Sequence, residues 1–316
     1  MSTRRNRSVA IVAVTALVSA AAVAGCGSSS KSSTTSTSAS SAAASSSPGS
    51  ATTSTASSAN ASIAALVPAS IKTNGLIVAA DATYAPDEFI ASDGHTVIGM
   101  DADLMKAIGA LMGVKVNVKN ATFDSIIPGL AAGKYDVGAS SFTDTKEREK
   151  TVDFVTYFTA GESFFTKASG GTTVSGLADL CGHTVAVEKG TTEESDAMTQ
   201  SGKCTKSGKA KVTVLSFPDQ NGANLALSSG KAQLGFADSP VAAYQVKQSN
   251  GQFKLVGASI ANAPYGLAVA KHSSLAPAIL AAVKVLMQNG DYTKILTHWG
   301  IQGGAITNPV INGATS

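Results

Sequence analysis

Residues 101–140 read DADLMKAIGALMGVKVNVKNATFDSIIPGLAAGKYDVGAS, and this stretch decides the fold of the chain. Apolar residues recur at helical spacing after Asp101, which we expect to cap a helix that ends near Gly113. The pattern then predicts a strand at 114–118, a short helix at 125–132 and a strand at 135–140. Short strands that alternate with helices are typical of an α/β sheet and not of a helix bundle or a β-sandwich.

The same alternation continues on both sides of this stretch, from about residue 68 to residue 300. Further strands are predicted at 76–80, 184–188, 212–217, 233–237, 253–256 and 265–270. Further helices are predicted at 192–200, 223–229, 240–248, 275–287 and 292–299. Because the pattern restarts after Lys167, we expect two α/β units of roughly a hundred residues each, a normal size for one hydrophobic core.

The first 25 residues have the three parts of an export signal. These are the basic Arg4, Arg5 and Arg7, an apolar run at 9–18 that is too short to span a bilayer, and small residues at 20–25. Val-Ala-Gly-Cys at 23–26 resembles a bacterial lipobox, which implies that residues 1–25 are a lipoprotein signal peptide and that Cys26 is acylated. The alternatives are an ordinary signal peptide with an incidental cysteine, and twin-arginine export.

Residues 27 to about 62 consist almost entirely of Ser, Thr, Ala and Gly, with Lys31 as the only charge. Such a chain buries too little surface to offset the entropy cost of ordering it. We therefore expect residues 26–66 to be the lipid anchor and a disordered tether, on the extracytoplasmic face of the cell membrane. The tether either lets the globular part dock on a membrane partner or is a simple spacer.

The charge distribution does not favour nucleic-acid binding. The chain has 24 basic and 21 acidic residues, and three of the basic ones precede Cys26, so the exported chain is close to neutral. The sequence has no stripe of Lys and Arg interleaved with aromatic residues, which is the footprint of a nucleic-acid binder. We expect no nucleic-acid partner.

Cys181 and Cys204 remain as a pair once Cys26 is assigned to lipid. Outside the cytoplasm, an even remainder of cysteines favours a disulfide. It would close a loop of roughly twenty residues, worth about 3 kcal/mol in the chain-entropy model. A metal site and two free thiols are the alternatives, but no His lies near enough to complete a zinc site.

Six short motifs follow the tether in the order and at the spacing of one known family. They are Asp81-Ala-Thr-Tyr84-Ala-Pro, Gly99-Met-Asp101-Ala-Asp103-Leu, Thr143-Asp-Thr145-Lys-Glu147-Arg148, Asp153-Phe154, Gly190-Thr191-Thr192 and Ala237-Asp238-Ser-Pro-Val. The chain resembles the extracellular solute-binding proteins of polar amino acid ABC transporters, family 3, in lipoprotein form. The resemblance implies a two-lobed α/β fold of the periplasmic-binding-protein-like type II, in which the lobes close on a ligand.

The resemblance also implies how the chain is divided. Lobe 1 is expected at 67–165 and 266–308, lobe 2 at 166–265, and two crossing hinge strands near 162–167 and 265–271. The implied function is to bind a polar amino acid and to deliver it to an ABC permease. We expect a monomer that needs no cofactor and no metal.

An amino acid headgroup carries a carboxylate and an ammonium, and in a water-poor cleft each needs an opposite charge or oriented dipoles. Arg148 is the expected partner of the carboxylate, because a planar guanidinium offers two parallel donors. By itself, an Arg in a charged run is more often a solvated helix residue. The resemblance favours the binding role, and it places Thr143 and Ser141 at the same headgroup.

The second lobe is expected to supply the other side of the headgroup site. Thr191 and Thr192 lie where a strand gives way to a helix, so N–H groups there either face the carboxylate or belong to an ordinary helix cap. Asp238 follows a predicted strand, and ligands bind at the carboxyl ends of strands in open α/β sheets. Because Ser239 and Pro240 already begin the next helix, Asp238 is expected to hold the ammonium, as the matching family aspartate does.

Asp81, Tyr84 and Phe123 match family positions at the side-chain end of the cleft. An acid beside an aromatic face suits a cationic side chain, through a salt bridge and a cation–π contact, and it also suits an amide or a hydroxyl. The family commonly has Phe where this chain has Asp87. If Asp87 points into the cleft, it strengthens the case for a basic ligand. If it points outward, it gives no information about the ligand.

Two other functions stay open at this level. The same fold hosts lyases of the cyclohexadienyl or arogenate dehydratase kind, but such an enzyme needs a positioned proton donor or acceptor. The histidines are each expected to be structural or exposed: His95, His183, His272 and His298. Because the sequence also has no nucleophile-elbow, metalloprotease or P-loop motif, we expect no enzyme. The other possibility is a ligand sensor that signals to a membrane receptor.

Overall fold

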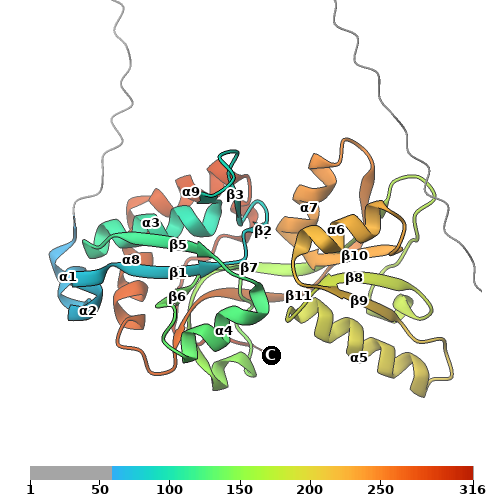
Figure 1. The fold of residues 1–316 in the computed structure, drawn as a ribbon, viewed down its shortest axis with the longest axis horizontal. Coiled ribbons are helices and arrows are strands. Elements are labelled where there is room, and N and C mark those ends of the chain that lie inside the picture. Colours follow the sequence, from blue (N-terminus) through green and yellow to red (C-terminus); the bar gives the residue numbers. More distant parts are fainter. Residues whose placement is uncertain (1–58, 316) are drawn as a thin grey trace, which may run out of the picture. The chain divides into compact units, whose positions relative to one another are not determined.

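The computed structural model describes residues 59–315, which belong to one unit of the chain. Their strands form an eight-stranded sheet in the order β5-β1-β6-β11-β7-β10-β8-β9 and a small sheet in the order β2-β3-β4 (Figure 1). The large sheet consists of β1 Leu76–Ala80, β5 Val116–Asn120, β6 Val137–Gly138, β7 Val152–Lys167, β8 Thr184–Glu188, β9 Thr213–Phe217, β10 Leu234–Asp238 and β11 Phe253–Ala270. The predicted signal peptide, Cys26 and residues 27–58 of the tether lie outside the described residues.

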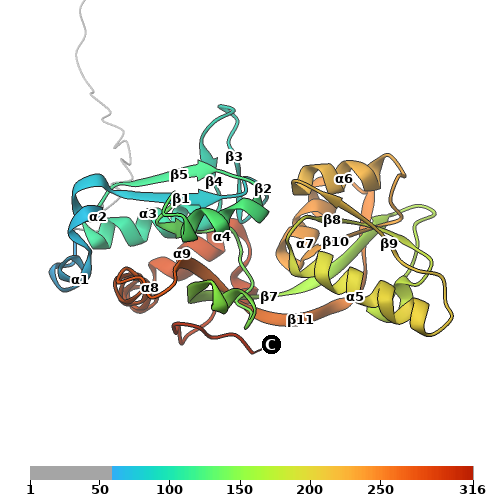
Figure 2. The same ribbon diagram turned by 60° about the horizontal axis from the view of Figure 1, so that its bottom comes forward.

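The two strands β7 and β11 are shared by both lobes. They pair antiparallel, from Phe253 opposite Lys167 to Ala270 opposite Val152, and connect the two halves of the large sheet (Figure 2). The sequence pattern predicts two separate strands at 253–256 and 265–270, whereas β11 is one strand with three register shifts. Glycine and proline interrupt its apolar pattern, but pairing with the long, buried β7 keeps the segment extended.

The first lobe surrounds β5, β1 and β6. Its main helices are α3 Met100–Met112, α4 Phe123–Ala131, α8 Ala276–Asn289 and α9 Asp291–Trp299. Its core joins residues from before and after the second lobe, such as Ile108 of α3 and Ile279 of α8, so the C-terminal helices return to the first lobe. The small sheet consists of β2 Thr83–Tyr84, β3 Glu88–Ile90 and β4 Val97–Ile98. Such short strands leave no periodic signal in the sequence, and we did not predict them.

Asp101 does not cap α3, so that prediction is wrong. Gly99 is the N-cap residue, with a φ of 128°, and a β-carbon there would lie 2.2 Å from the Asp87 carbonyl oxygen. Asp101 lies in the first turn and is fully buried. Its carboxylate is occupied inside the lobe, because it accepts hydrogen bonds from the Ser141 N–H at 2.9 Å and from the Tyr157 hydroxyl at 2.6 Å.

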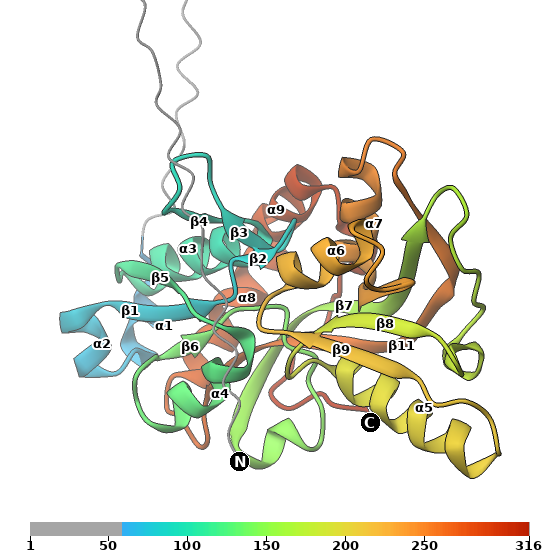
Figure 3. The ribbon, with the colours of Figure 1, turned by 45° about the vertical axis from the view of Figure 1, so that its right-hand side comes forward.

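The second lobe is built on β10, β8 and β9. Helix α5 Thr192–Lys206 covers one face of these strands, and α6 Gln220–Ser228 and α7 Ser239–Gln248 cover the other (Figure 3). Phe164, Val185, Leu234 and Phe236 are central members of its core. Each lobe therefore has its own apolar core, and the large sheet passes through both.

Two short helices, α1 Ala61–Leu66 and α2 Ala69–Asn74, precede β1. The sequence predicts tether as far as residue 66, but residues 61–66 are helical. The Asn60 side chain caps α1 by accepting hydrogen bonds from the backbone N–H groups of Ser62 and Ile63, and Ile63 is buried in the core of the first lobe. None of the described helices is long and apolar enough to cross a membrane.

Cys181 and Cys204 form a disulfide, with their sulfur atoms 1.95 Å and their Cα atoms 5.6 Å apart. The bond ties the end of the short helix η2 Leu177–Leu180 to α5 in the second lobe. Among residues 59–315, no group of three or more His, Cys, Asp and Glu side chains is arranged to hold a metal ion.

Reduction of this disulfide should lower the free energy of unfolding by about 3 kcal/mol, because the unfolded chain regains the freedom of a loop of roughly twenty residues. Urea unfolding followed by circular dichroism, with and without reductant, measures this change. A Cys181→Ala/Cys204→Ala variant is the control, since its unfolding should not respond to reductant. Equal unfolding midpoints for the oxidised and the reduced chain would contradict the prediction.

Candidate functional site

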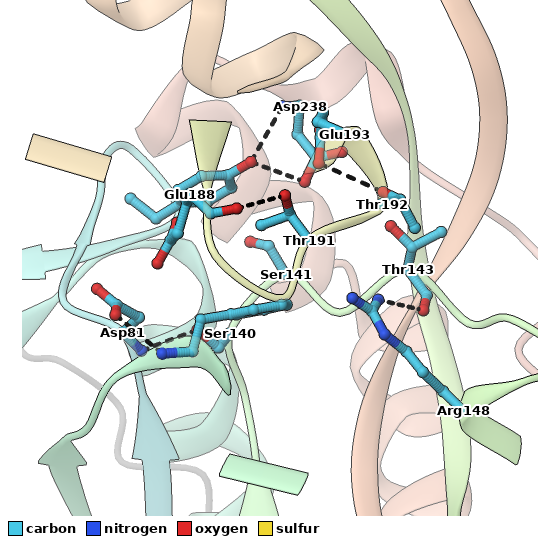
Figure 4. Close-up of a pocket in the computed structure, with 12 residues that line it drawn as sticks. Asp81, Ser140, Ser141, Thr143, Arg148, Glu188, Thr191, Thr192, Glu193 and Asp238 are labelled. Atoms are coloured by element: carbon cyan, nitrogen blue, oxygen red, sulfur yellow. Dashed lines mark hydrogen bonds between the residues drawn. The ribbon is translucent and has the colours of Figure 1, made fainter. Parts of the chain in front are cut away.

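A narrow pocket lies between the two lobes (Figure 4). It is lined by Asp81, Tyr84, Phe123, Ser140, Ser141, Thr143, Arg148, Glu188, Thr191, Thr192, Glu193 and Asp238. All nine residues that the sequence suggests for ligand binding are in this set. Their role in binding stays a prediction, but the structure brings them together from segments that are far apart in the sequence.

The strand ends explain why these side chains meet. Asp81 directly follows β1, and Ser140 and Ser141 follow β6, which is parallel to β1. Glu188 and Asp238 are the last residues of β8 and β10, which are also parallel to each other. The carboxyl ends of parallel strands form one edge of a sheet, and in each lobe this edge faces the pocket.

The Arg148 guanidinium contacts both lobes. Its Nη1 donates to the Thr143 carbonyl oxygen at 2.8 Å, and its Nη2 donates to the Gly190 carbonyl oxygen of the second lobe at 3.0 Å. It also lies over the rings of Phe123 and Phe142, with centroid distances of 5.3 and 5.5 Å. The two rings and the two carbonyl groups hold the cation in place, and further N–H donors of the guanidinium remain for a ligand.

Thr191 and Thr192 mark the start of α5 on the opposite side of the pocket. The Thr191 hydroxyl donates to the Glu188 carbonyl oxygen at 2.8 Å and accepts from the Glu194 N–H at 3.2 Å, so this side chain is an ordinary helix cap. The Thr192 hydroxyl donates to Glu193 Oε2 at 3.3 Å. Both residues nevertheless line the pocket, and they place the N-terminal end of the helix against it.

Asp238 and Tyr84 join the lobes through two hydrogen bonds. The Tyr84 hydroxyl donates to Asp238 Oδ2 and accepts from the Asp238 N–H, both at 3.0 Å. Asp238 is the N-cap residue of α7, but its side chain makes no capping bond, which leaves the carboxyl group in the pocket. Burial and the nearby charge of Glu193 raise the pKa of Asp238 well above its ordinary value. Glu193 is itself buried, and its Oε1 has no hydrogen-bond partner within residues 59–315.

Asp81 and Glu188 face each other from opposite lobes (Figure 4). Asp81 accepts from the Thr83 hydroxyl at 2.6 Å and from the Phe123 N–H at 3.0 Å. Burial raises the pKa of Asp81, and burial together with the charge of Asp81 raises the pKa of Glu188. Glu188 is 2% exposed, and its Oε1 has no hydrogen-bond partner among the described residues. None of the hydrogen bonds described for Asp81 and Glu188 comes from a cationic side chain.

Residues 76–302 match the model of one protein family, the bacterial extracellular solute-binding proteins, family 3. The chain belongs to this family. ArgT, the arginine-binding protein of Corynebacterium glutamicum, is 36% identical over 252 residues, which are 79% of this chain and 82% of that protein.

Two solved structures extend the comparison for this solute-binding protein. An ancestral arginine-binding protein bound to arginine is 37% identical, with a TM-score of 0.66, and the match covers 71% of this chain and 97% of that chain. An ancestral amino acid-binding protein that is a precursor of cyclohexadienyl dehydratase is 33% identical, with a TM-score of 0.65 and coverage of 73% and 97%. The likeness confirms the predicted two-lobed α/β fold.

Asp87 lies behind the pocket of this solute-binding protein and does not line it. It is fully buried, and its Oδ2 accepts from the Ser141 hydroxyl at 3.1 Å. The same hydroxyl is 3.2 Å from Glu88 Oε2, so two buried acids share it. Burial and the charge of Asp101 raise the pKa of Asp87. Asp87 therefore points into the lobe, and it offers a ligand no direct contact.

Sequence reasoning missed Ser140, Glu188 and Glu193 in this solute-binding protein. Ser140 and Glu188 end two strands that the sequence predicts, so the rule for strand ends was a signal for both. Glu193 follows Thr192 in the first turn of α5, where an acid is ordinarily explained by the helix dipole. Its burial between Arg148 and Asp238 depends on the approach of two lobes, which the sequence does not reveal.

Proposed function

We propose that this family 3 solute-binding protein binds a basic amino acid between its lobes and delivers it to an ABC permease. An acylated Cys26 holds the protein on the extracytoplasmic face of the cell membrane, where it acts as a monomer. The observation that carries the ligand assignment is the charge of the pocket lining. Four buried carboxyl groups accompany one guanidinium, that of Arg148, and the four belong to Asp81, Glu188, Glu193 and Asp238.

A zwitterionic headgroup alone leaves this charge unbalanced. Its carboxylate takes Arg148 and its ammonium takes Asp238, with Glu193 beside them. Asp81 and Glu188 then remain at the other end, near the Phe123 ring. A buried carboxylate without a partner is costly, so a neutral ligand side chain would force both groups to stay protonated. The guanidinium or ammonium group of a basic side chain, placed between Asp81 and Glu188, supplies positive charge to a carboxylate of each lobe.

The contacts between the lobes support a closure mechanism. Arg148 reaches Gly190, Tyr84 reaches Asp238, and the Gln220 N–H donates to the Thr83 hydroxyl at 3.1 Å. Each of these contacts joins the first lobe to the second near the pocket. The ligand adds to them because its two ends engage residues of both lobes, and hinge closure of this kind is the usual behaviour of periplasmic binding proteins.

The relatives support binding without turnover. The arginine-binding protein from Corynebacterium glutamicum covers most of this chain, and the neighbour related to cyclohexadienyl dehydratase is itself an amino acid-binding precursor. A lyase remains the second candidate, because buried carboxyl groups of raised pKa such as Glu188 are suitable proton donors. A sensor and a transport receptor would bind the same ligand, so a neighbouring permease gene is what separates those two roles.

The decisive experiment compares arginine with citrulline, which has nearly the same shape and no side-chain charge. Calorimetry on residues 27–316 should show binding of arginine, lysine or ornithine, and citrulline should bind at least about a hundredfold more weakly. The radius of gyration from solution scattering should fall when the basic ligand binds, and the ligand should be recovered intact. Tighter binding of citrulline or another neutral amino acid would refute the basic ligand, and conversion of prephenate or arogenate would establish the lyase.

A further inference from the structure

The C-terminal strap, residues 305–314, lies beyond the part of the chain that matches the family. It runs along β7, with antiparallel bridges between Phe158 and Ala305 and between Val155 and Ile311. The sequence places the end of lobe 1 at residue 308, whereas contacts with the lobe continue to Ala314. The strap has no regular helix or strand, so its position depends on individual hydrogen bonds.

Four hydrogen bonds fix the middle of the strap to β7. The Thr156 N–H donates to the Val310 carbonyl oxygen, and the Val310 N–H donates to the Thr156 hydroxyl, both at 2.9 Å. Asn312 repeats the pattern with Phe154, using its N–H and its Oδ1, again at 2.9 Å. These bonds direct the last residues of the strap toward the segment 143–149.

The end of the strap contacts Asp144, which lies in the sequence between the site residues Thr143 and Arg148. The Gly313 N–H donates to Asp144 Oδ2 at 2.7 Å, and the Ala314 N–H donates to Glu149 Oε1 at 3.2 Å. Asp144 is fully buried, and its own N–H donates to the Pro264 carbonyl oxygen of β11 at 2.8 Å. Asp144 is therefore held on one side by a hinge strand and on the other by the strap.

Arg148 depends on this same stretch of backbone. Its Nη1 rests on the Thr143 carbonyl oxygen, and its N–H donates to the Thr145 hydroxyl at 3.2 Å. A shift of Asp144 moves both of these supports, because Thr143 and Thr145 are its chain neighbours. Gly313 permits the close approach, since a β-carbon there would lie 2.9 Å from Thr156 Cγ2 and 3.0 Å from Val310 Cγ2.

We propose that the C-terminal strap is a positioning element for the carboxylate-binding arginine. Asp144 links the strap to the segment 143–148, so that the strap sets where the Arg148 guanidinium meets the ligand. The proposal rests on the proposed function in one respect, namely that Arg148 binds the carboxylate of an amino acid. It adds a determinant of affinity that touches no ligand and that lies outside the matched family region.

The test uses variants on both sides of the contact, in residues 27–316 with arginine as the probe. Asp144→Ala removes the acceptor, and Gly313→Val pushes the strap away. Each should raise the dissociation constant by about tenfold in calorimetry. The double variant should lose no more than either single one, because both break the same link. Asp144→Asn should stay within about twofold of the parent, since its amide oxygen can still accept a hydrogen bond from the Gly313 N–H.

Three outcomes would overturn the proposal: unchanged affinity in both single variants, multiplied losses in the double variant, or equal losses in Asp144→Ala and Asp144→Asn. Removal of Thr315 and Ser316, which lie after the last strap contact, is the matched control and should change nothing. If the parent chain binds no basic amino acid, the proposed function fails separately. In that case the rate of amide hydrogen exchange in residues 143–149 tests whether the strap positions this segment. Asp144→Ala should accelerate the exchange, and Asp144→Asn should leave its rate unchanged.

Discussion

Arg148→Ala should weaken the binding of a basic amino acid by about 4 kcal/mol, roughly a thousandfold in the dissociation constant. The substitution leaves the ligand carboxylate buried without a partner, and it also removes the contact with Gly190 that links the lobes. Calorimetry measures the loss. Arg148→Lys keeps a positive charge without the planar fork, so its affinity should fall between those of the parent and the alanine variant.

Lys189→Ala is the matched control for this prediction. Lys189 also forms a contact between the lobes, an ion pair with Asp124 at 2.8 Å, but both side chains are substantially exposed. Exposed ion pairs contribute little, so this variant should change the dissociation constant by less than about twofold. An Arg148→Ala variant that binds as well as Lys189→Ala would remove Arg148 from the site.

The affinity for a basic amino acid should rise with pH, and the rise should extend above the range in which exposed carboxyl groups titrate. The pKa values of Asp81 and Glu188 are both raised, mainly by burial, so these groups hold protons at a pH where exposed carboxyl groups have lost them. A cation between them favours the ionised forms, and the protons must leave when it binds. Rising pH removes the cost of that release, and the affinity therefore increases until both groups are ionised in the free protein.

The double variant Asp81→Asn/Glu188→Gln should lose about 3 kcal/mol of arginine binding, and its affinity should depend much less on pH. Citrulline is the control ligand, because a neutral side chain releases no protons from this pair. Calorimetry in two buffers of different ionisation enthalpy counts the protons directly. Arginine binding without proton release, or the same pH slope in the parent and in the double variant, would rule out Asp81 and Glu188 as the cation subsite.

Much of the fold follows from local pattern, and the departures have physical causes. The predicted strands at 76–80 and 184–188 coincide with β1 and β8, because each is a β-branched run between turn residues. The strand expected at 135–140 is only Val137–Gly138, since residues beyond it bend into the pocket. The sequence predicts two strands in place of β11 because glycine and proline interrupt its apolar pattern, whereas pairing with β7 and β6 keeps the segment extended.

Sequence motifs predict most of the candidate site, and the pocket residues that the sequence does not predict lie outside these motifs. Seven of the nine residues named from sequence lie in the six short motifs, and the family resemblance placed the other two, Ser141 and Phe123. Glu188 and Glu193 lie in none of these motifs, and their surroundings include charged residues of the opposite lobe. Asp87 illustrates the same limit, because the side on which a single acid lies depends on Ser141, which is 54 residues away in the sequence. The C-terminal strap gave no signal, since backbone N–H groups make its contacts with the segment 143–149.

The return of the C-terminal helices to the first lobe has a consequence for folding after export. The core of the second lobe lies within one stretch of chain, 164–256, but the core of the first lobe needs residues 63–160 together with 265–296. A chain that emerges N-terminus first therefore completes its second lobe while the first still lacks α8 and α9. During that interval α3, which carries the core residues Leu104 and Ile108, lacks its packing against α8 and α9. We expect this incomplete first lobe to be the part of the newly exported protein that aggregates most readily.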